Sequence, residues 1–348
     1  MINVDVAVLG AGQAGLSAAY YLRKFGLDFV VLDRGERPGG AWQYRWPSLR
    51  LGKAHHIHDL PGIPMPDRDE FAPASEVVSN YFAEYESELA LPVRRPVAVE
   101  AVRDAGDRLH VETSGGTWAA RAVVNATGTW GRPFWPAYPG RETFRGRQLH
   151  TADYRTAEEF HGKQVVVVGG GASAVQLLDE ISQVTSTTWV TRRPPIWREG
   201  DFTPEVGRAA VALVEQAVRE GRPPASVVSV TGLLLTPAIR AARERGVLER
   251  LPMFTRLTPD GVAWSDGHSV PADVILWCTG FRPVIDHLSP LRLREPRGGI
   301  LMDGTRAVRE PRLHLVGYGP SASTLGATRA GRAAAVEIRE LLENTEAA

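Results

Sequence analysis

A glycine-rich hexapeptide near the start of the chain has the spacing of a phosphate-binding turn. The sequence GAGQAG follows an apolar run, Val4–Leu9, and precedes a helical pattern over residues 16–25. In such a turn the first glycine permits the tight bend, the second lets backbone N–H groups approach a pyrophosphate, and the third lets helix and strand pack closely. The helix N-terminus adds unsatisfied donors. The hexapeptide therefore predicts a dinucleotide site that includes Gly10, Gly12, Gln13, Ala14 and Gly15.

An acidic residue follows at the position that selects the ribose. A second apolar run, Phe29–Leu32, ends on Asp33, with Arg34 beside it. A carboxylate there accepts a hydrogen bond from a ribose 2′-hydroxyl and repels a 2′-phosphate. A glycine-rich turn alone is a weak signal, but the strand–turn–helix–strand order with the acid in place strengthens it. The first site is predicted to bind FAD or NAD.

The same pattern occurs a second time, with a different residue at the ribose position. Residues 165–174 (VVVVGGGASA) repeat the strand and the turn at a constant shift of 159 residues, which carries Asp33 onto Arg192. A guanidinium suits a 2′-phosphate, with which it makes bidentate hydrogen bonds, although Arg192 could also be an ordinary solvated charge. The second site is predicted to bind NADPH through Gly169, Gly171, Ala172, Ser173, Ala174, Arg192 and Arg193.

The rest of each half supports a duplicated architecture. Alternating residues over 97–124 predict an antiparallel β-meander that ends in the turn Ala126-Thr127-Gly128. Three short strands over 254–277 lead in the same way into Cys278-Thr279-Gly280. A final strand ends in the turn Gly317–Gly319, and a helix is expected over 325–342. The fold class is α/β, with two three-layer Rossmann-like domains, each a parallel sheet plus a meander. Residues 1–158 and 285–348 form the discontinuous first domain, and residues 159–284 form the inserted second domain.

Several segments carry weaker signals. Helical spacing over 75–90 predicts a helix with Ser75 as its N-cap, and residues 201–250 are expected to be mostly helical, without an assigned role. The turn-rich stretch 37–50 is either a packed loop with aromatic plugs or a loop that passes close to an extended cofactor. Downstream, a cluster of histidines and an aspartate has none of the usual zinc spacings, so no metal site is predicted at His55, His56, His58 and Asp59.

Composition limits the function classes. The 348 residues include 40 basic and 40 acidic side chains, so nothing suggests a nucleic-acid or anionic membrane partner. The N-terminal segment lacks the features of a signal peptide, and no apolar stretch has transmembrane length. A single cysteine, Cys278, excludes an internal disulfide framework and indicates a cytoplasmic location. A homodimer is left open.

A family resemblance covers essentially the whole chain. The segment FRGRQLHTADY, Phe144–Tyr154, resembles the fingerprint F-x-G-x-x-x-H-x-x-x-(Y/F) of the class B flavin-dependent monooxygenases, and the length resembles their short bacterial flavin-containing members. The fingerprint lies just before the second glycine-rich turn, as in the family. In the Baeyer–Villiger branch it usually ends in tryptophan followed by proline or aspartate, whereas Tyr154-Arg155 stands here. That departure favours the branch that oxidises heteroatoms.

The resemblance implies two cofactors and one chemistry. In the family NADPH reduces FAD, O₂ adds to the flavin as a hydroperoxide, and one oxygen passes to a soft nucleophile, a sulfide or amine, of a small organic substrate. The expected FAD site extends from the first turn to Gly40, Ala41, Trp42 and Val99, to the turn at Ala126, Thr127 and Gly128, and to Gly317, Tyr318 and Leu325. The NADPH site gains the turn at Cys278, Thr279 and Gly280. Lys53, where relatives often have asparagine, is a catalytic candidate or a surface lysine.

Rival functions are separated by chemistry. A disulfide reductase of the same fold needs a cysteine pair, and this chain has one cysteine. Baeyer–Villiger oxidation of ketones, an NADPH oxidase and a redox-sensing flavoprotein remain as alternatives. The sequence does not name the substrate.

Overall fold

The chain forms two compact units, and the second interrupts the first. The computed structural model describes residues 1–54, 57–66, 69–199, 204–224 and 232–346. Unit 1 comprises residues 1–131, 208–227 and 283–348, and unit 2 comprises residues 132–207 and 228–282. Compared with the predicted division, residues 132–158 lie in unit 2, and residues 208–227 and 283–284 lie in unit 1. The fold class is α/β, as predicted.

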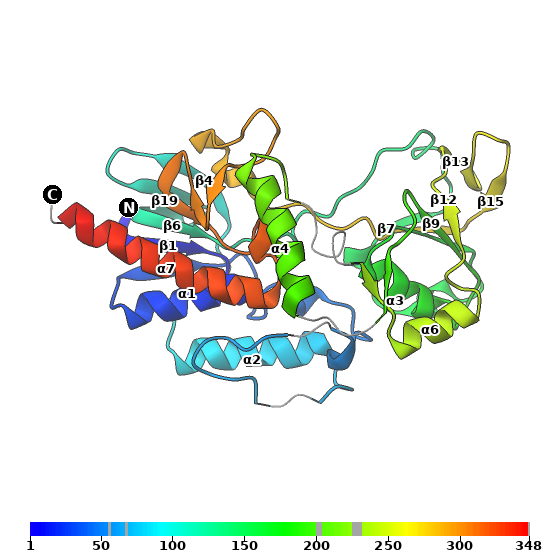
Figure 1. The fold of residues 1–348 in the computed structure, drawn as a ribbon, viewed down its shortest axis with the longest axis horizontal. Helices are drawn as coiled ribbons and strands as arrows, with labels where there is room; N and C mark the ends of the chain where they lie inside the picture. Colours follow the sequence, from blue (N-terminus) through cyan, green and yellow to red (C-terminus); the bar gives the residue numbers. More distant parts are fainter. Residues whose placement is uncertain (55–56, 67–68, 200–203, 225–231, 347–348) are drawn as a thin grey trace. The chain divides into compact units, whose positions relative to one another are not determined.

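Unit 1 is built on a parallel sheet with an antiparallel extension (Figure 1). The apolar residues of β1 from Val4 onward and all residues of β2 are buried, so these strands lie inside the sheet, and β6 and β19 continue it on the other side of β1. The predicted meander is present, since β4 pairs antiparallel with β5, and β5 pairs antiparallel with β6. The strands of unit 1 are β1 (Ile2–Leu9), β2 (Phe29–Leu32), β3 (Val93–Arg94), β4 (Val99–Asp104), β5 (Leu109–Thr113), β6 (Gly116–Asn125), β17 (Met302–Asp303), β18 (Arg306–Ala307) and β19 (Glu310–Leu315).

Two helices of unit 1 run side by side and approach closely, because the residues between them are small. α1 spans Gln13–Lys24, and α7 spans Thr324–Glu346, the position of the expected C-terminal helix (Figure 1). A Cβ at Gly331 of α7 would lie 2.7 Å from the backbone nitrogen of Ala18, so only glycine allows this approach. The other long helices are α2 (Ala74–Glu88) and α4 (Pro204–Arg219).

Unit 2 contains a second parallel sheet, in the order β12-β9-β8-β16-β7. Its strands are β7 (Arg147–His150), β8 (Val165–Val168), β9 (Thr187–Thr191), β12 (Arg250–Pro252) and β16 (Val274–Trp277), and its helices are α3 (Ala172–Ile181) and α6 (Pro237–Glu244). Two small sheets accompany it, one of β10 (Trp197–Arg198) with β11 (Leu233–Leu234) and one of β13 (Arg256–Thr258), β14 (Gly261–Ala263) and β15 (Ser269–Pro271). Six short 3₁₀ turns lie in the described part of the chain: η1 (Trp42–Tyr44), η2 (Leu51–Lys53), η3 (Thr151–Asp153), η4 (Ala157–Phe160), η5 (Asp286–Leu291) and η6 (Gly319–Ser321).

Two local features of the fold depart from the expected pattern. In unit 2 the meander is a separate sheet, because β15 ends at Pro271, which cannot donate a ladder hydrogen bond, whereas β6 of unit 1 continues without a break. Ser75 is not an N-cap: α2 begins at Ala74, and Pro73 precedes it without a side-chain cap. The segment expected to be mostly helical contains α4 and α6, and residues 200–203 and 225–231 lie outside the described residues.

Candidate functional site

The three glycines of the first turn have different surroundings. Gly10 has a φ of +100°, and a Cβ added there would lie 2.7 Å from the carbonyl oxygen of Ala126. A Cβ on Gly15 would collide with the carbonyl of Gly10. At Gly12, by contrast, the nearest atom to an added Cβ is the Cα of Gly40, 4.0 Å away. The first and third glycines therefore pack against protein, and the second borders open space.

The second turn has the same construction. Gly169 has a φ of +139°, and a Cβ there would collide with the carbonyl oxygen of Cys278. No atom lies within 4 Å of a Cβ added to Gly171, and Ala174 is fully buried. In both units the blocking carbonyl belongs to the first residue of the small-residue turn, Ala126 or Cys278. The predicted equivalence of these two turns is thus present in three dimensions.

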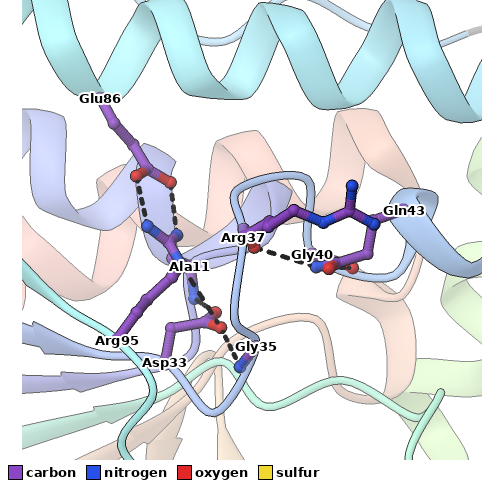
Figure 2. A network of polar contacts seen from close by, with 8 residues as sticks. All are labelled: Ala11, Asp33, Gly35, Arg37, Gly40, Gln43, Glu86 and Arg95. Carbon is purple, nitrogen blue, oxygen red and sulfur yellow. Dashed lines mark hydrogen bonds and ion pairs between the residues drawn. The ribbon is translucent and has the colours of Figure 1, made fainter.

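The predicted ribose acid lies at the centre of a buried polar network (Figure 2). Asp33 accepts a hydrogen bond from the N–H of Ala11 at 2.6 Å through Oδ2 and one from the N–H of Gly35 at 2.7 Å through Oδ1. The carboxylate therefore holds the glycine-rich turn and the following turn together. Each oxygen keeps a further lone pair that a ribose hydroxyl could use.

An ion pair that sequence reasoning missed supports this network. Arg95, just after β3, donates two hydrogen bonds to Glu86 of α2, at 2.7 and 2.6 Å, and its Nε lies 3.7 Å from Oδ1 of Asp33 (Figure 2). The side chains of Arg95 and Glu86 are only 12% and 10% exposed. The pair joins α2 to the strand end that carries Asp33, and its members come from segments with no recognisable pattern.

Removal of Glu86 is expected to destabilise the fold strongly. In Glu86→Ala the Arg95 guanidinium stays buried without its bidentate partner, so the free energy of unfolding should fall by about 3 kcal/mol. Chemical denaturation measures this change. Glu112→Ala is the matched control, because its partner Arg103 is 56% exposed and a surface pair contributes about 0–1 kcal/mol. Similar small losses in both variants would contradict the assigned role of Glu86.

The end of β9 carries positive charge where β2 carries Asp33. Arg192 and Arg193 are exposed, and within the described ranges neither side chain has a hydrogen bond or ion pair. Thr191 donates a 2.7 Å hydrogen bond to the carbonyl of Arg193, and Nη1 of Arg250, from the neighbouring β12, lies 3.3 Å from the carbonyl and the hydroxyl of Thr191. Three guanidinium groups therefore belong to this strand end.

A third turn joins the first site. A Cβ at Gly317 would lie 3.5 Å from the Cβ of Ala14, so the Gly317–Gly319 turn lies beside the start of α1. Tyr318 is buried, and Leu325 is 36% exposed on the first turn of α7. Gln13 donates hydrogen bonds of 3.0 Å to the carbonyl of His58 and to the hydroxyl of Thr328.

The Ala126–Gly128 turn is fixed by a buried histidine network. The hydroxyl of Thr127 donates to the carbonyl of Val284 at 2.6 Å, and Nε2 of His287 lies 2.7 Å from Oδ1 of Asn125. Because Asn125 Oδ1 is an acceptor, His287 donates from Nε2. Burial lowers the pKa of His287 to about 4, against the opposing effect of Asp286. His287 thus anchors β6 where the turn begins.

Acid is expected to destabilise the protein through this histidine. The unfolded imidazole takes up its proton near pH 6.5, whereas the folded one stays neutral to about pH 4. Between these values the unfolded state binds more protons, so the free energy of unfolding falls as pH falls, by about 1.4 kcal/mol per pH unit for this group. Urea denaturation between pH 4.5 and 6 measures the slope. His287→Gln keeps a donor for Asn125 without titrating and should reduce the slope by that amount, and an unchanged slope would contradict the prediction.

A family model and a solved structure both match this chain. Residues 7–222 match the family model described as pyridine nucleotide-disulphide oxidoreductase. A flavin-containing monooxygenase from Stenotrophomonas maltophilia is 40% identical, with a TM-score of 0.84 over 98% of this chain and 100% of that one. The chain belongs to this family of flavin-dependent monooxygenases.

Other relatives match a smaller part of their own length. A Baeyer-Villiger monooxygenase from Streptomyces coelicolor is 32% identical over 64% of this chain and 43% of its own. An uncharacterized CzcO-like oxidoreductase from Geobacillus kaustophilus is 30% identical over 52% of each chain. The chain spans about half the length of these curated relatives. A cyclohexanone monooxygenase structure, 17% identical with a TM-score of 0.70, shares the fold.

The family fingerprint has a structural role in unit 2. A Cβ at Gly146 would collide with the Phe144 ring. His150 is fully buried, and its Nε2 lies 3.1 Å from the carbonyl of Gly280, while its Nδ1 accepts from the N–H of Ala152. Tyr154 donates to Glu180 at 2.7 Å. The fingerprint thus supports the Cys278–Gly280 turn, a contact that sequence patterns did not predict.

The name of the family model raises the question of disulfide chemistry. Cys278 is the chain's one cysteine, and burial raises the pKa of its thiol to about 12. A buried, protonated thiol without a second cysteine in the chain cannot perform dithiol exchange. The chain therefore does not supply the cysteine pair that dithiol exchange requires.

The structure gives the positions of the remaining candidate residues but no contact that assigns them a chemical role. Lys53 is exposed at the end of η2, and Trp42 is half-buried in η1. Val99 packs against the core of unit 1, and it is Val97 whose N–H donates to the carbonyl of Asp33, at 2.8 Å. Over the described residues no three metal-ligating side chains come together, and His55 and His56 lie outside that part of the chain. None of the described helices is long and apolar enough to cross a membrane.

Proposed function

We propose that the monooxygenase binds FAD in unit 1 and NADPH in unit 2, and that it uses O₂ to oxygenate a sulfur or nitrogen atom of a small organic molecule. One observation carries the cofactor assignment. Two turns of the same construction stand at strand ends of opposite charge, with the buried carboxylate of Asp33 in unit 1 and the exposed guanidinium of Arg192 in unit 2. A free ribose suits the first strand end, and a 2′-phosphate suits the second.

The residues present fit these two groups. Gly12 and Gly171 are the N-caps of α1 and α3, neither helix has a side-chain cap, and open space borders both glycines. The first N–H groups of each helix are therefore available to a pyrophosphate. The Ala126–Gly128 and Cys278–Gly280 turns stand next to these helix starts.

The roles of the chain's own groups follow from their positions. FAD, when bound, would supply the electron transfer and the reaction with O₂. Asp33 would accept from the ribose while it holds the N–H of Ala11, and the Gly317 turn would close the site beside Ala14. Arg192 and Arg193 would hold the 2′-phosphate through charged hydrogen bonds. His287 and His150 would keep the two small-residue turns in place.

The test combines cofactor content with product analysis. The purified protein is expected to hold one FAD per chain and to oxidise NADPH faster when thioanisole is added. The product should be the sulfoxide, with its oxygen derived from isotope-labelled O₂. NADPH oxidation at one rate with and without a sulfide or amine, with hydrogen peroxide as the product, would instead assign an oxidase or a redox sensor.

A second reaction receives support from one comparison. The 32% identical Streptomyces coelicolor relative is a Baeyer-Villiger monooxygenase. Cyclohexanone offered in the same assay should give lactone if this reaction belongs to the chain. The Tyr154-Arg155 ending of the fingerprint favours heteroatom oxidation, so we expect the sulfide to be the better substrate.

A further inference from the structure

An arginine in unit 1 lies over two indole rings. The Cζ atom of Arg45 is 4.7 Å from the ring centroid of Trp130 and 5.6 Å from that of Trp42. Tyr44 stacks on Trp130, with ring centroids 6.3 Å apart and planes 9° from parallel. Cation–π attraction to these aromatic rings therefore helps to hold the Arg45 guanidinium in place.

This arginine has no protein anion to balance it. Among the described residues its side chain makes no hydrogen bond and no ion pair, and its Nε is buried without a partner. Burial alone lowers the pKa of Arg45 to about 10, with no contribution from a carboxylate. The two Nη groups are not among the buried, unpartnered atoms, so they stay open to solvent or to a ligand. A partly desolvated, unpaired cation is costly to the fold, and an anionic ligand would offset that cost.

The cluster formed by Arg45, Tyr44, Trp42 and Trp130 lies beside the first nucleotide site. Gly40, two residues before Trp42, packs against Gly12, since a Cβ on Gly40 would lie 2.8 Å from the Cα of Gly12. Trp130 follows Gly128, the last residue of the turn that ends β6. Trp42 and Trp130, the two rings that contact Arg45, therefore both follow turns that we assign to the FAD site.

We propose that Arg45 binds a carboxylate of the organic substrate, so that the preferred substrates are thioethers or amines that carry a carboxylate. The proposal rests on the proposed oxygenation and adds the substrate class. A guanidinium with two open Nη groups can hold the two oxygens of one carboxylate, and the indole walls suit the apolar remainder of a small molecule. The uncapped start of α1 already provides N–H donors for the pyrophosphate, so that group does not require Arg45.

The experiment uses a matched pair of ligands, 3-(methylthio)propanoate and its carboxamide. In the holoenzyme kcat/KM should favour the carboxylate, mostly through KM. Arg45→Gln should lower kcat/KM for the carboxylate by about 10- to 100-fold, the range of a charged hydrogen bond, and change the carboxamide by less than about 3-fold. Arg50→Gln, an exposed arginine of the same segment, is the control and should change neither.

Calorimetry without NADPH separates this proposal from the oxygenation itself. The oxidised holoenzyme should bind the carboxylate more tightly than the carboxamide, and Arg45→Gln should abolish the difference, even if neither compound is oxygenated. Equal binding of the two compounds by the unmodified protein would overturn the proposal. Loss of FAD or NADPH affinity in Arg45→Gln, with the carboxylate preference intact, would also overturn it and assign Arg45 to a nucleotide phosphate.

Discussion

A Gly12→Val variant is expected to fold and to lose FAD. Gly12 has a φ of −90° and a ψ of −171°, an extended conformation that valine adopts readily, and a Cβ there meets no atom closer than 4.0 Å. The cost to the apoprotein is that of a poorer N-cap, about 1 kcal/mol. The added methyl groups occupy the space where a pyrophosphate would approach the first N–H groups of α1. Loss of two such charged hydrogen bonds weakens FAD binding by more than about 100-fold.

Two further substitutions make this test specific. Gly171→Val in unit 2 has the same geometry, with φ −100° and ψ 174°, and should weaken NADPH binding while the protein keeps its flavin. Gly10→Val should fail to fold, because it adds a Cβ 2.7 Å from the carbonyl of Ala126 at a φ of +100°. Flavin absorbance, NADPH titration and thermal unfolding measure the three outcomes. A fully flavinated Gly12→Val protein would refute the assignment of the first turn.

These three glycines show how far the sequence could be interpreted. Their spacing, and the 159-residue repeat, predicted two turns, two strand ends and the A/C-T-G turns that accompany them. The prediction was possible because each feature is local, or is a copy of a local feature. The structure adds the reason for the pairing: the carbonyls of Ala126 and Cys278 block the same position in the two units.

The contacts that support the first site could not be predicted from the sequence in the same way. Arg95 and Glu86 meet only because β3 pairs with β2 and α2 ends nearby, and nothing in their spacing indicates a pair. His287 lies 162 residues from Asn125, yet it fixes the end of β6. Such contacts depend on tertiary packing, which periodicity does not specify.

Arg45 illustrates the same limit within a single loop. Sequence patterns marked Trp42 as a candidate cofactor contact and passed over the arginine three residues later. An arginine in a turn-rich segment is normally solvated, whereas this one contacts two aromatic rings, and one of them is contributed by the distant residue Trp130. The contact with residue 130 depends on tertiary packing, so the spacing of residues within the loop could not reveal it.

NADPH is expected to exceed NADH in kcat/KM by about 10- to 150-fold, the worth of a hydrogen bond to a charged group. The physical reason is that equivalent strand ends carry opposite charges: Asp33 follows β2 in unit 1, and Arg192 follows β9 in unit 2. Arg192 is exposed and has no ion pair within the described part of the chain, so no protein carboxylate competes with a 2′-phosphate. The preference should act mainly through KM, since the phosphate is remote from the reacting atoms.

Replacement of Arg192 by glutamine should remove most of this preference, because it weakens NADPH binding far more than NADH binding. Arg193 is exposed beside it and can partly compensate, so the double variant should lose more. Arg243→Gln, an equal change of charge on the exposed face of α6, is the matched control and should leave the ratio unchanged. The preference should also shrink as salt rises, because an exposed phosphate–guanidinium pair is screened. If the unmodified enzyme uses NADH and NADPH equally well, Arg192 does not contact the nucleotide, and the equivalence of the two strand ends does not extend to the ribose.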